Sequence, residues 1–245
     1  MKKNSHLNPE SRIQNPGSAN PPHIILAASI LGADPLNIER DLVRCETTKE
    51  VEWVQVDTID GHFAPNISFG PDVVGHIRKR SSLFIDVHLM CERPLGLIRP
   101  FAENGADLIT VHLEAKDAAY KGLRLIRSLG KKAGLALKPK TPLARALPLL
   151  PLVDLLLIMT VEPGFAGQKF INACLDKVRQ AREIIERQRL QIPWIEVDGG
   201  INETTIPQVV RAGANVLVCG SSMFRETPAI CVPRLRQAVA SANNV

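Results

Sequence analysis

The sequence of 245 residues is poor in aromatic side chains, which make up 4% of it and include a single tyrosine. No apolar run approaches the ~20 residues that a membrane-spanning helix needs, so we expect no membrane segment. The five cysteines are odd in number, and none belongs to a Cys-x-x-Cys pair. They predict reduced thiols and a cytoplasmic protein rather than a zinc or disulfide framework.

Positive charge is in modest excess, with a formal net charge of +5 spread along the chain. A nucleic-acid-binding surface would need basic side chains gathered on one face, with aromatic residues among them. Because aromatic residues are so few, we expect no nucleic-acid partner and interpret the basic clusters as solvated surface. A weak positive field would still favour an anionic small-molecule substrate.

Residues 1–22 differ from the rest of the chain because they are polar, contain Asn, Ser and Pro, and lack apolar periodicity. The Met-Lys-Lys start is not followed by a hydrophobic segment, so it does not predict export. We interpret residues 1–22 as a disordered tail and residues 23–245 as one catalytic domain. A chain of this length can bury about 70–75% of its unfolded surface, which is enough for a full core.

Eight short apolar runs follow the tail, and helix-like amphipathic segments such as residues 35–47 and 171–189 separate them. The runs are residues 24–28, 51–56, 83–87, 108–111, 133–137, 153–159, 194–197 and 216–219. Strands that are apolar on both faces are typical of a buried parallel sheet. Eight βα units in one domain predict an α/β fold of the (β/α)8 TIM-barrel type. An open doubly wound sheet is the alternative, but residues 28–32 lack the glycine-rich first turn of a dinucleotide site.

Polar side chains gather at the ends of these runs, where barrel enzymes carry their chemistry. Asp57, His88 and Asp198 directly follow the second, third and seventh runs, where we expect the strands to end, and Ser29 follows the first run. Gln55 precedes Asp57 by two positions, so both side chains share one face of the strand. A single Asp or His would be read as a helix cap or a structural residue. Their convergence at the mouth of the barrel predicts a functional site there. His112 and Glu114, which follow the fourth run, would also lie close to this site.

Glycine-rich segments follow the last three strands. Residues 198–200 (Asp-Gly-Gly) follow the seventh run, and residues 220–222 (Gly-Ser-Ser) follow the eighth. Barrels often bind phosphate with backbone N–H groups from these two loops, and glycine lets the backbone approach the anion closely. Residues 163–168 follow the sixth run and are long enough to fold over the mouth. The alternative interpretation of all three segments is a set of tight turns without a ligand.

Four stretches carry a resemblance to a known family. They are VDTIDGHFAPN at residues 56–66, DVHLM at 86–90, MTVEPGFAGQKF at 159–170 and EVDGG at 196–200. In this order they resemble the ribulose-phosphate 3-epimerase family, over roughly residues 24–224. The resemblance implies a ribulose-phosphate-binding barrel and a metal-dependent isomerase of the pentose phosphate pathway. Such an enzyme interconverts ribulose 5-phosphate and xylulose 5-phosphate.

The resemblance also implies a role for each matching residue. Asp57 would accept a proton and Asp198 would donate one, as an inversion beside a ketone requires acid/base groups on both faces of the substrate. Asp57, His88 and Asp198 would bind one divalent metal ion per chain (zinc, iron, manganese or cobalt), which would stabilise the enediolate. The implied partners are a phosphorylated ketose and further copies of the chain in a homo-oligomer. The residues expected to hold substrate and phosphate are Ser29, His88, Gly164, Phe165, Ala166, Gly167, Gly199, Gly200, Gly220 and Ser221, with Met90 and Met159 lining the site.

The sequence departs from the family pattern at one metal ligand, because Gln55 stands where the family has a histidine. Ala28 replaces a proline before the substrate-binding serine, and Ile59 replaces a methionine before Asp-Gly-His. An amide oxygen is a weaker and harder donor than imidazole, better suited to magnesium, manganese or calcium. We therefore expect metal affinity to be reduced, whether Gln55 is a fourth ligand or bonds only within the barrel.

Two other functions use the same residues and stay open. One is an epimerase acting on a different ketose phosphate, and the other is a non-catalytic sugar-phosphate-binding paralogue with a weakened metal site. Retention of both Asp57 and Asp198 argues against the second. A decarboxylase of the orotidine-phosphate type would need an Asp-x-Lys-x-x-Asp motif, and residues 57–60 do not begin one.

Overall fold

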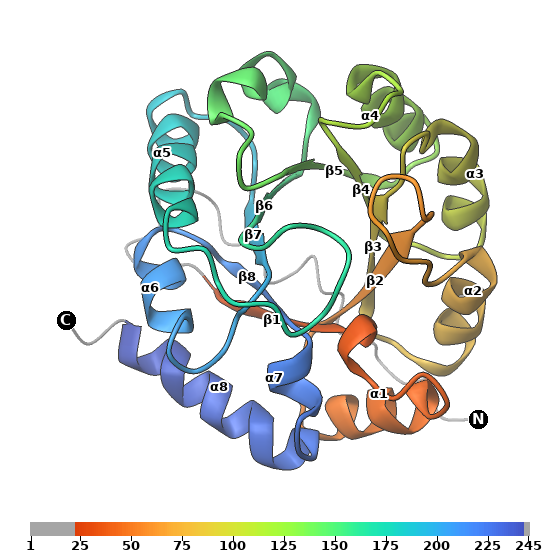
Figure 1. Ribbon diagram of the computed structural model, residues 1–245, viewed down its shortest axis with the longest axis vertical. Helices are drawn as coiled ribbons and strands as arrows, with labels where there is room; N and C mark the ends of the chain where they lie inside the picture. The colour runs from red at the N-terminus through yellow and green to blue at the C-terminus, as the bar shows by residue number, and fades with distance from the viewer. Residues whose placement is uncertain (1–22, 243–245) are drawn as a thin grey trace, which may run out of the picture.

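A computed structural model describes residues 23–242, in which strands and helices alternate around a closed barrel (Figure 1). Eight parallel strands pair in chain order, and the last pairs with the first. They are β1 (Ile25–Ser29), β2 (Trp53–Ile59), β3 (Phe84–Met90), β4 (Leu108–His112), β5 (Lys132–Leu137), β6 (Leu155–Met159), β7 (Trp194–Asp198) and β8 (Val216–Cys219). The (β/α)8 barrel expected from the eight apolar runs is confirmed. The tail expected at residues 1–22 lies outside the described part of the chain.

The helices form a ring outside the strands (Figure 1). They are α1 (Ile38–Thr47), α2 (Pro71–Arg80), α3 (Leu95–Glu103), α4 (Ala119–Ser128), α5 (Cys174–Arg187), α6 (Ile206–Arg211), α7 (Ser221–Phe224) and α8 (Pro228–Ala242), with short 3-10 helices η2 (Ile30–Gly32), η3 (Leu143–Arg145) and η4 (Leu147–Leu152). Between residues 23 and 242, no helix has both the length and the apolar character to cross a membrane.

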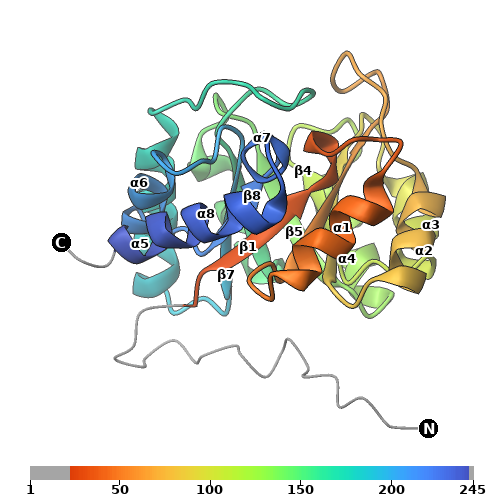
Figure 2. The same ribbon diagram turned by 90° about the horizontal axis from the view of Figure 1, so that it is seen from below.

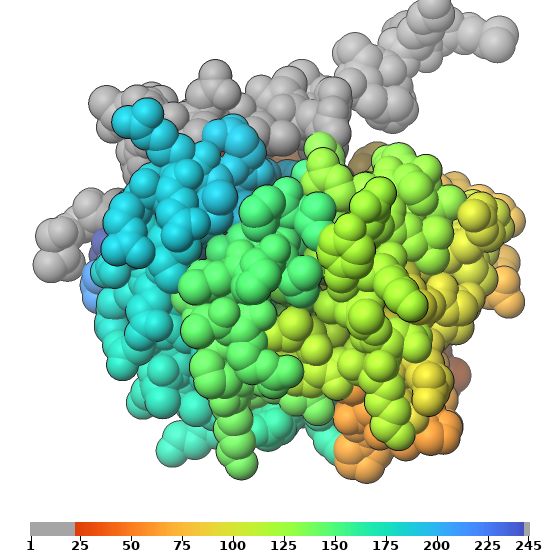
Figure 3. Space-filling view, turned by 90° about the horizontal axis from the view of Figure 1, so that it is seen from above, coloured from red at the N-terminus to blue at the C-terminus, as the bar shows by residue number. Residues whose placement is uncertain are grey.

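The connection from β5 to β6 contains η3 and η4 where the other units have an α-helix. Pro142, Pro148 and Pro151 lack a backbone N–H, and inside a helix their rings clash with the preceding turn, so three of them within ten residues strongly disfavour a continuous α-helix there. On the flank of the barrel shown in Figure 3, this connection fills the space between α4 and α5. It therefore covers the strands in place of a helix.

The barrel interior is apolar at one end and polar at the other. Trp53, Phe84 and Trp194 fill the end where the strands begin, with ring centroids 4.4 Å apart for Trp53–Phe84 and 5.0 Å for Trp53–Trp194. Since side chains alternate along a strand, residues two and four positions later also point inward. On β2 these are Gln55 and Asp57, so the polar side chains lie toward the other end. The connections after β2 and β6 project from that end (Figure 2).

Candidate active site

The residues predicted to contact substrate line a cavity at the carboxyl ends of the strands. Its walls contain Asp57 and Asp198, together with Ser29, Met90, Met159, Gly164, Phe165, Ala166, Gly167, Gly199, Gly200, Gly220 and Ser221. His88, also predicted to contact substrate, is fully buried and does not line the cavity, and the same holds for Gln55. The structure therefore places His88 and Gln55 behind the wall that Asp57 and Asp198 form.

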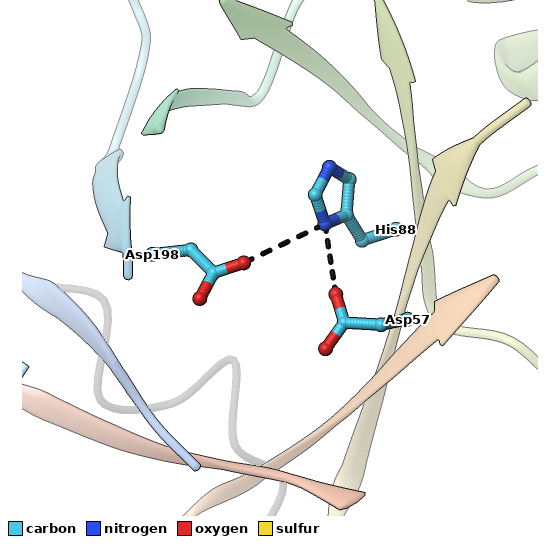
Figure 4. Close-up of side chains that lie close together, drawn as sticks. All are labelled: Asp57, His88 and Asp198. Atoms are coloured by element: carbon cyan, nitrogen blue, oxygen red, sulfur yellow. Dashed lines mark hydrogen bonds and ion pairs between the residues drawn. The ribbon is translucent and has the colours of Figure 1, made fainter. Parts of the chain in front are cut away.

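Asp57, His88 and Asp198 point toward one another from β2, β3 and β7 (Figure 4). His88 Nδ1 lies 2.9 Å from Asp57 Oδ1 and 3.7 Å from Asp198 Oδ2. One candidate ligand atom of each residue lies within 4.8 Å of the other two. Two carboxylate oxygens and one imidazole nitrogen are suitable donors for zinc, iron or manganese. The three side chains therefore fit a divalent metal ion.

Gln55 directs its amide hydrogens at this cluster. Its Nε2 donates to Asp57 Oδ1 at 2.8 Å and to Asp198 Oδ2 at 3.2 Å, and lies 3.5 Å from His88 Nδ1. Its Oε1 is buried and has no hydrogen-bond partner among the described residues. In this orientation Gln55 is a donor to the carboxylates. Its Oε1 atom could contact a cation held by Asp57 and Asp198 only if the amide group rotated by about 180°.

The two carboxyl groups of the cluster differ in their affinity for protons. Burial raises the pKa of Asp198 to about 7, and the neighbouring charge of Asp57 acts in the same direction. Burial also acts to raise the pKa of Asp57, but hydrogen bonds from His88, Ser29 and Gln55 outweigh it and lower that pKa below 3.8. The Ser29 hydroxyl donates to Asp57 Oδ2 at 2.6 Å. One ionised carboxylate beside one that binds a proton near neutrality is the arrangement of a base and an acid.

The loops after β7 and β8 depend on close backbone contacts. Gly199 and Gly200 have φ angles of +117° and +67°, which favour glycine. A Cβ on Gly200 would lie 2.6 Å from the backbone nitrogen of Phe170. A Cβ on Gly32 would lie 2.5 Å from the carbonyl carbon of Gly220. Gly32 is not among the predicted site residues, because its contact joins distant parts of the chain and leaves no local pattern.

The segment between β6 and α5 contributes Val161 and residues 164–168 to the cavity wall. Asn66 Nδ2 donates to the Gly164 carbonyl oxygen at 2.8 Å and ties this segment to the β2–α2 loop. Gln168 Nε2 donates to the carbonyl oxygens of Glu162 at 2.7 Å and Phe165 at 3.0 Å. Asn66 and Gln168 belong to the family-like stretches but are not predicted site residues. Gln168 itself lines the cavity, whereas Asn66 supports the loop from outside the cavity.

Two further carboxyl groups, those of Asp86 and Glu196, are fully buried in the barrel interior. They precede His88 and Asp198 by two positions and share their inward face. Burial raises the pKa of Asp86 to about 7 and that of Glu196 well above its ordinary value. Burial therefore shifts both groups toward the neutral form. Sequence reasoning missed them, although the same two-residue alternation that places Gln55 beside Asp57 could have found them.

His112 and Glu114 extend the polar cluster on the side of β4. His88 Nε2 lies 2.9 Å from His112 Nε2, and His112 Nδ1 lies 3.1 Å from Glu114 Oε2. Burial lowers the pKa of His112 to about 4, against the opposing effect of Glu114. Burial alone would raise the pKa of Glu114, but hydrogen bonds from His112 and Thr141 contribute to lowering it to about 2. Near neutral pH the pair is a neutral imidazole beside an ionised carboxylate.

This ionised carboxylate predicts a pH-dependent contribution to stability. Glu114→Gln should lower the free energy of unfolding at pH 7 by about 2 kcal/mol, since it removes a hydrogen bond to a charged group. A carboxyl group with a folded pKa of about 2 and an ordinary value of 4.5 stabilises the fold above pH 4.5. That stabilisation disappears as the pH falls toward about 2.

Urea denaturation of wild type and Glu114→Gln between pH 7 and pH 3 measures this effect, with Glu183→Gln on the exposed side of α5 as the matched control. The stability difference between wild type and Glu114→Gln should narrow below pH 4.5, and the control should show no such change. A difference that stays constant over this range would contradict the assignment of an ionised Glu114.

Solved structures of enzymes that act on sugar phosphates share the fold of this chain. A 3-hexulose-6-phosphate synthase has a TM-score of 0.62 at 21% identity, covering 88% of this chain and 100% of that chain. A 3-keto-L-gulonate-6-phosphate decarboxylase from Vibrio cholerae has a TM-score of 0.64 at 15% identity, covering 90% and 98% respectively. At these identities the likeness concerns the barrel alone.

Similarity in sequence is more specific. The ribulose-phosphate 3-epimerase of Treponema pallidum is 45% identical over 202 residues, which cover 82% of this chain and 92% of that protein. The ribulose-phosphate 3-epimerase of Synechocystis is 42% identical over 224 residues, covering 91% of this chain and 94% of that protein. Residues 25–224 match the profile described as the ribulose-phosphate 3 epimerase family. The chain belongs to the ribulose-phosphate 3-epimerase family.

Proposed function

We propose that the protein inverts carbon 3 of a ketose phosphate and converts D-ribulose 5-phosphate to D-xylulose 5-phosphate. The observation that carries this proposal is the pair of carboxyl groups in the cavity wall, Asp57 with a lowered pKa and Asp198 with a pKa of about 7. Membership in the ribulose-phosphate 3-epimerase family supports the choice of substrate.

The proposed reaction moves one proton off carbon 3 and another onto its opposite face. Carbon 3 lies beside the carbonyl carbon, so loss of its proton gives an enediolate. Asp57 accepts that proton as the ionised base, and Asp198 donates a proton to the other face. In the reverse direction the two residues exchange roles. Their positions on β2 and β7, on different sides of the barrel, support this two-sided arrangement.

Asp57, His88 and Asp198 are the residues proposed to hold one divalent ion, whether zinc, iron, manganese or cobalt. When bound, the ion would act as a Lewis acid that stabilises negative charge on the substrate oxygens. Ser29 holds Asp57 in place through its 2.6 Å hydrogen bond. Gln55 donates to both carboxylates, so its amide competes with a cation for the same oxygens.

The glycine-rich loops are proposed to bind the phosphate of the substrate. Gly199, Gly200, Gly220 and Ser221 line the cavity, and glycine allows a phosphate to approach backbone N–H groups. Phe165 is 52% exposed on the segment after β6, where it would cover the sugar. A phosphorylated ketose therefore fits with its phosphate near β7 and β8 and its reacting carbon near Asp57 and Asp198.

Initial rates with ribulose 5-phosphate, measured beside a tetrulose phosphate and a hexulose 6-phosphate, test the proposed substrate. Zinc, manganese and iron are each added in separate assays. We expect kcat/KM to be highest with ribulose 5-phosphate. A higher value with another ketose phosphate would move the assignment to that sugar, and binding of ribulose 5-phosphate without turnover under any metal would identify a non-catalytic paralogue.

We further propose that the protein works in the cytoplasm as a homo-oligomer. All five cysteines are free and buried, which is consistent with a reducing compartment. The proposal of an oligomer rests on the resemblance to the family. Leu36 and Ile67, which are 90% and 79% exposed, supply apolar surface that a second copy of the chain could cover.

A further inference from the structure

The segment of residues 162–168 crosses the mouth of the barrel from β6 toward the β2–α2 loop (Figure 1, Figure 2). Among the residues that the structure describes, only one hydrogen bond joins this segment to another part of the chain. In this bond Asn66 Nδ2 donates to the Gly164 carbonyl oxygen at 2.8 Å. Both bonds of the Gln168 amide stay inside the segment. Gln168 therefore sets the shape of the segment, and Asn66 sets its place over the cavity.

The β2–α2 loop is a firm support because its own hydrogen bonds tie it to β2 and β3. Asp60 Oδ1 accepts two backbone N–H groups of the loop, and Asp60 Oδ2 accepts the N–H of Glu92, just beyond β3, at 2.7 Å. Ser68 Oγ accepts the N–H of Ile59, at the end of β2, at 2.9 Å. Asn66 lies between these two anchors along the chain, so its side chain projects from a fixed backbone.

The two loops also pack closely beside this hydrogen bond. Gly164 has a φ angle of +132°, and a Cβ there would lie 3.1 Å from the Cβ of Ala64. Ala64 is buried in a small apolar cluster with Ile59 and Met90, and Met90 lines the cavity. Glycine at position 164 thus lets the segment approach the β2–α2 loop closely enough for Asn66 to reach its carbonyl oxygen.

Holding the Gly164 carbonyl oxygen also orients the next peptide group. In a trans peptide the C=O and N–H bonds point in opposite directions, so the Phe165 N–H points away from Asn66. Within residues 23–242, no backbone N–H of residues 164–167 donates to a protein acceptor. Because these residues line the cavity, their N–H groups can donate to a ligand bound there.

We propose that Asn66 is a positioning residue that holds residues 164–167 over the cavity, where they bind the substrate. The identity of this substrate, a phosphorylated ketose, rests on the proposed function. Asp57 and Asp198 lie on strands, which keep their places whether or not the segment is held. Loss of the Asn66 bond should therefore weaken substrate binding and leave the rate of proton transfer almost unchanged.

Asn66→Asp replaces the donor by an oxygen atom of similar size. One Oδ atom can still accept the N–H of Ile67, as Asn66 Oδ1 now does at 2.9 Å. The KM for ribulose 5-phosphate should rise about 3–10-fold, as expected for the loss of one hydrogen bond, and kcat should change less than about twofold. Asn66→Ala, which adds no charge, should give the same result.

Asn104→Asp is the matched control and should change neither constant. Asn104 Nδ2 donates to the carbonyl oxygen of Pro100 at 2.9 Å at the end of α3, so the control also removes an amide donor from a backbone carbonyl. Asn104 does not line the cavity.

Limited proteolysis of the ligand-free protein with chymotrypsin reports the position of the segment without any assay of activity. Phe165 is 52% exposed, but cleavage after it requires the segment to leave its place and enter the protease. The rate of cleavage after Phe165 should be about 3–10-fold higher in Asn66→Asp than in the wild type. In Asn104→Asp it should equal the wild-type rate.

An unchanged KM or an unchanged cleavage rate in both Asn66 variants would overturn the proposal. A lower kcat at unchanged KM would also overturn it, because a substitution that only destabilises the fold reduces the fraction of active enzyme. Absence of turnover in the wild type would instead contradict the proposed function. The cleavage rates, measured without substrate, would still decide whether Asn66 holds the segment.

Discussion

Asp57→Asn should lower kcat with ribulose 5-phosphate by about 10²–10⁴-fold, and Asp198→Asn should lower it by a similar factor. Asparagine has nearly the same shape as aspartate but cannot accept a proton from carbon 3 or return one to it. Each substitution also removes a charged oxygen from the cluster with His88. Kinetic assays, together with the melting temperature and metal content of each variant, measure the effect.

Asp72→Asn provides the matched control, because Asp72 is exposed in the first turn of α2 and does not line the cavity. This variant should keep the rate of the wild type. If Asp57→Asn or Asp198→Asn retained more than roughly a tenth of the wild-type rate, the proposed proton transfer by the Asp57 and Asp198 carboxyl groups would be wrong.

Gln55→His should raise the affinity for zinc, iron and cobalt by about 10–100-fold or more, since an imidazole replaces a weak amide donor. The substitution also removes the two hydrogen bonds that the amide now donates to Asp57 and Asp198. Turnover should rise or become less dependent on added metal. Titration of apo protein with zinc and with manganese measures the change, and the wild type should prefer manganese.

Gln55→Leu separates the two contributions, because it removes the amide without adding a ligand. If it binds zinc as tightly as Gln55→His, the gain comes from releasing the carboxylates. If only the histidine variant gains affinity, the new nitrogen is responsible. A wild type that already binds one zinc ion tightly, with neither variant better, would show that Gln55 does not limit the site.

The fold could be predicted because a closed parallel barrel needs eight strands that are buried on both faces, and the sequence shows them as apolar runs. The ends of strands were harder to predict. Strand β2 continues through Ile59, beyond the expected end at Asp57, because its backbone stays paired with β3 as far as Ile59 and Met90. Pairing with a neighbouring strand is a tertiary contact, which hydrophobic periodicity does not record.

The site could be predicted in part for the same reason. The carboxyl ends of the strands meet at one mouth, so the barrel topology by itself predicts that Asp57, His88 and Asp198 approach one another. The direction of the Gln55 amide could not be predicted, since it depends on Asp198, 143 positions away. The contact between His88 and His112 likewise depends on the registration of two neighbouring strands.

Two-base proton transfer is tested most directly by running the reaction on ribulose 5-phosphate in deuterium oxide and observing carbon 3 by NMR. Asp198 exchanges its proton with the solvent and donates to the face opposite Asp57. The xylulose 5-phosphate that forms should therefore carry deuterium at carbon 3. Product that keeps the original hydrogen of the substrate at carbon 3 would contradict transfer through two separate carboxylates.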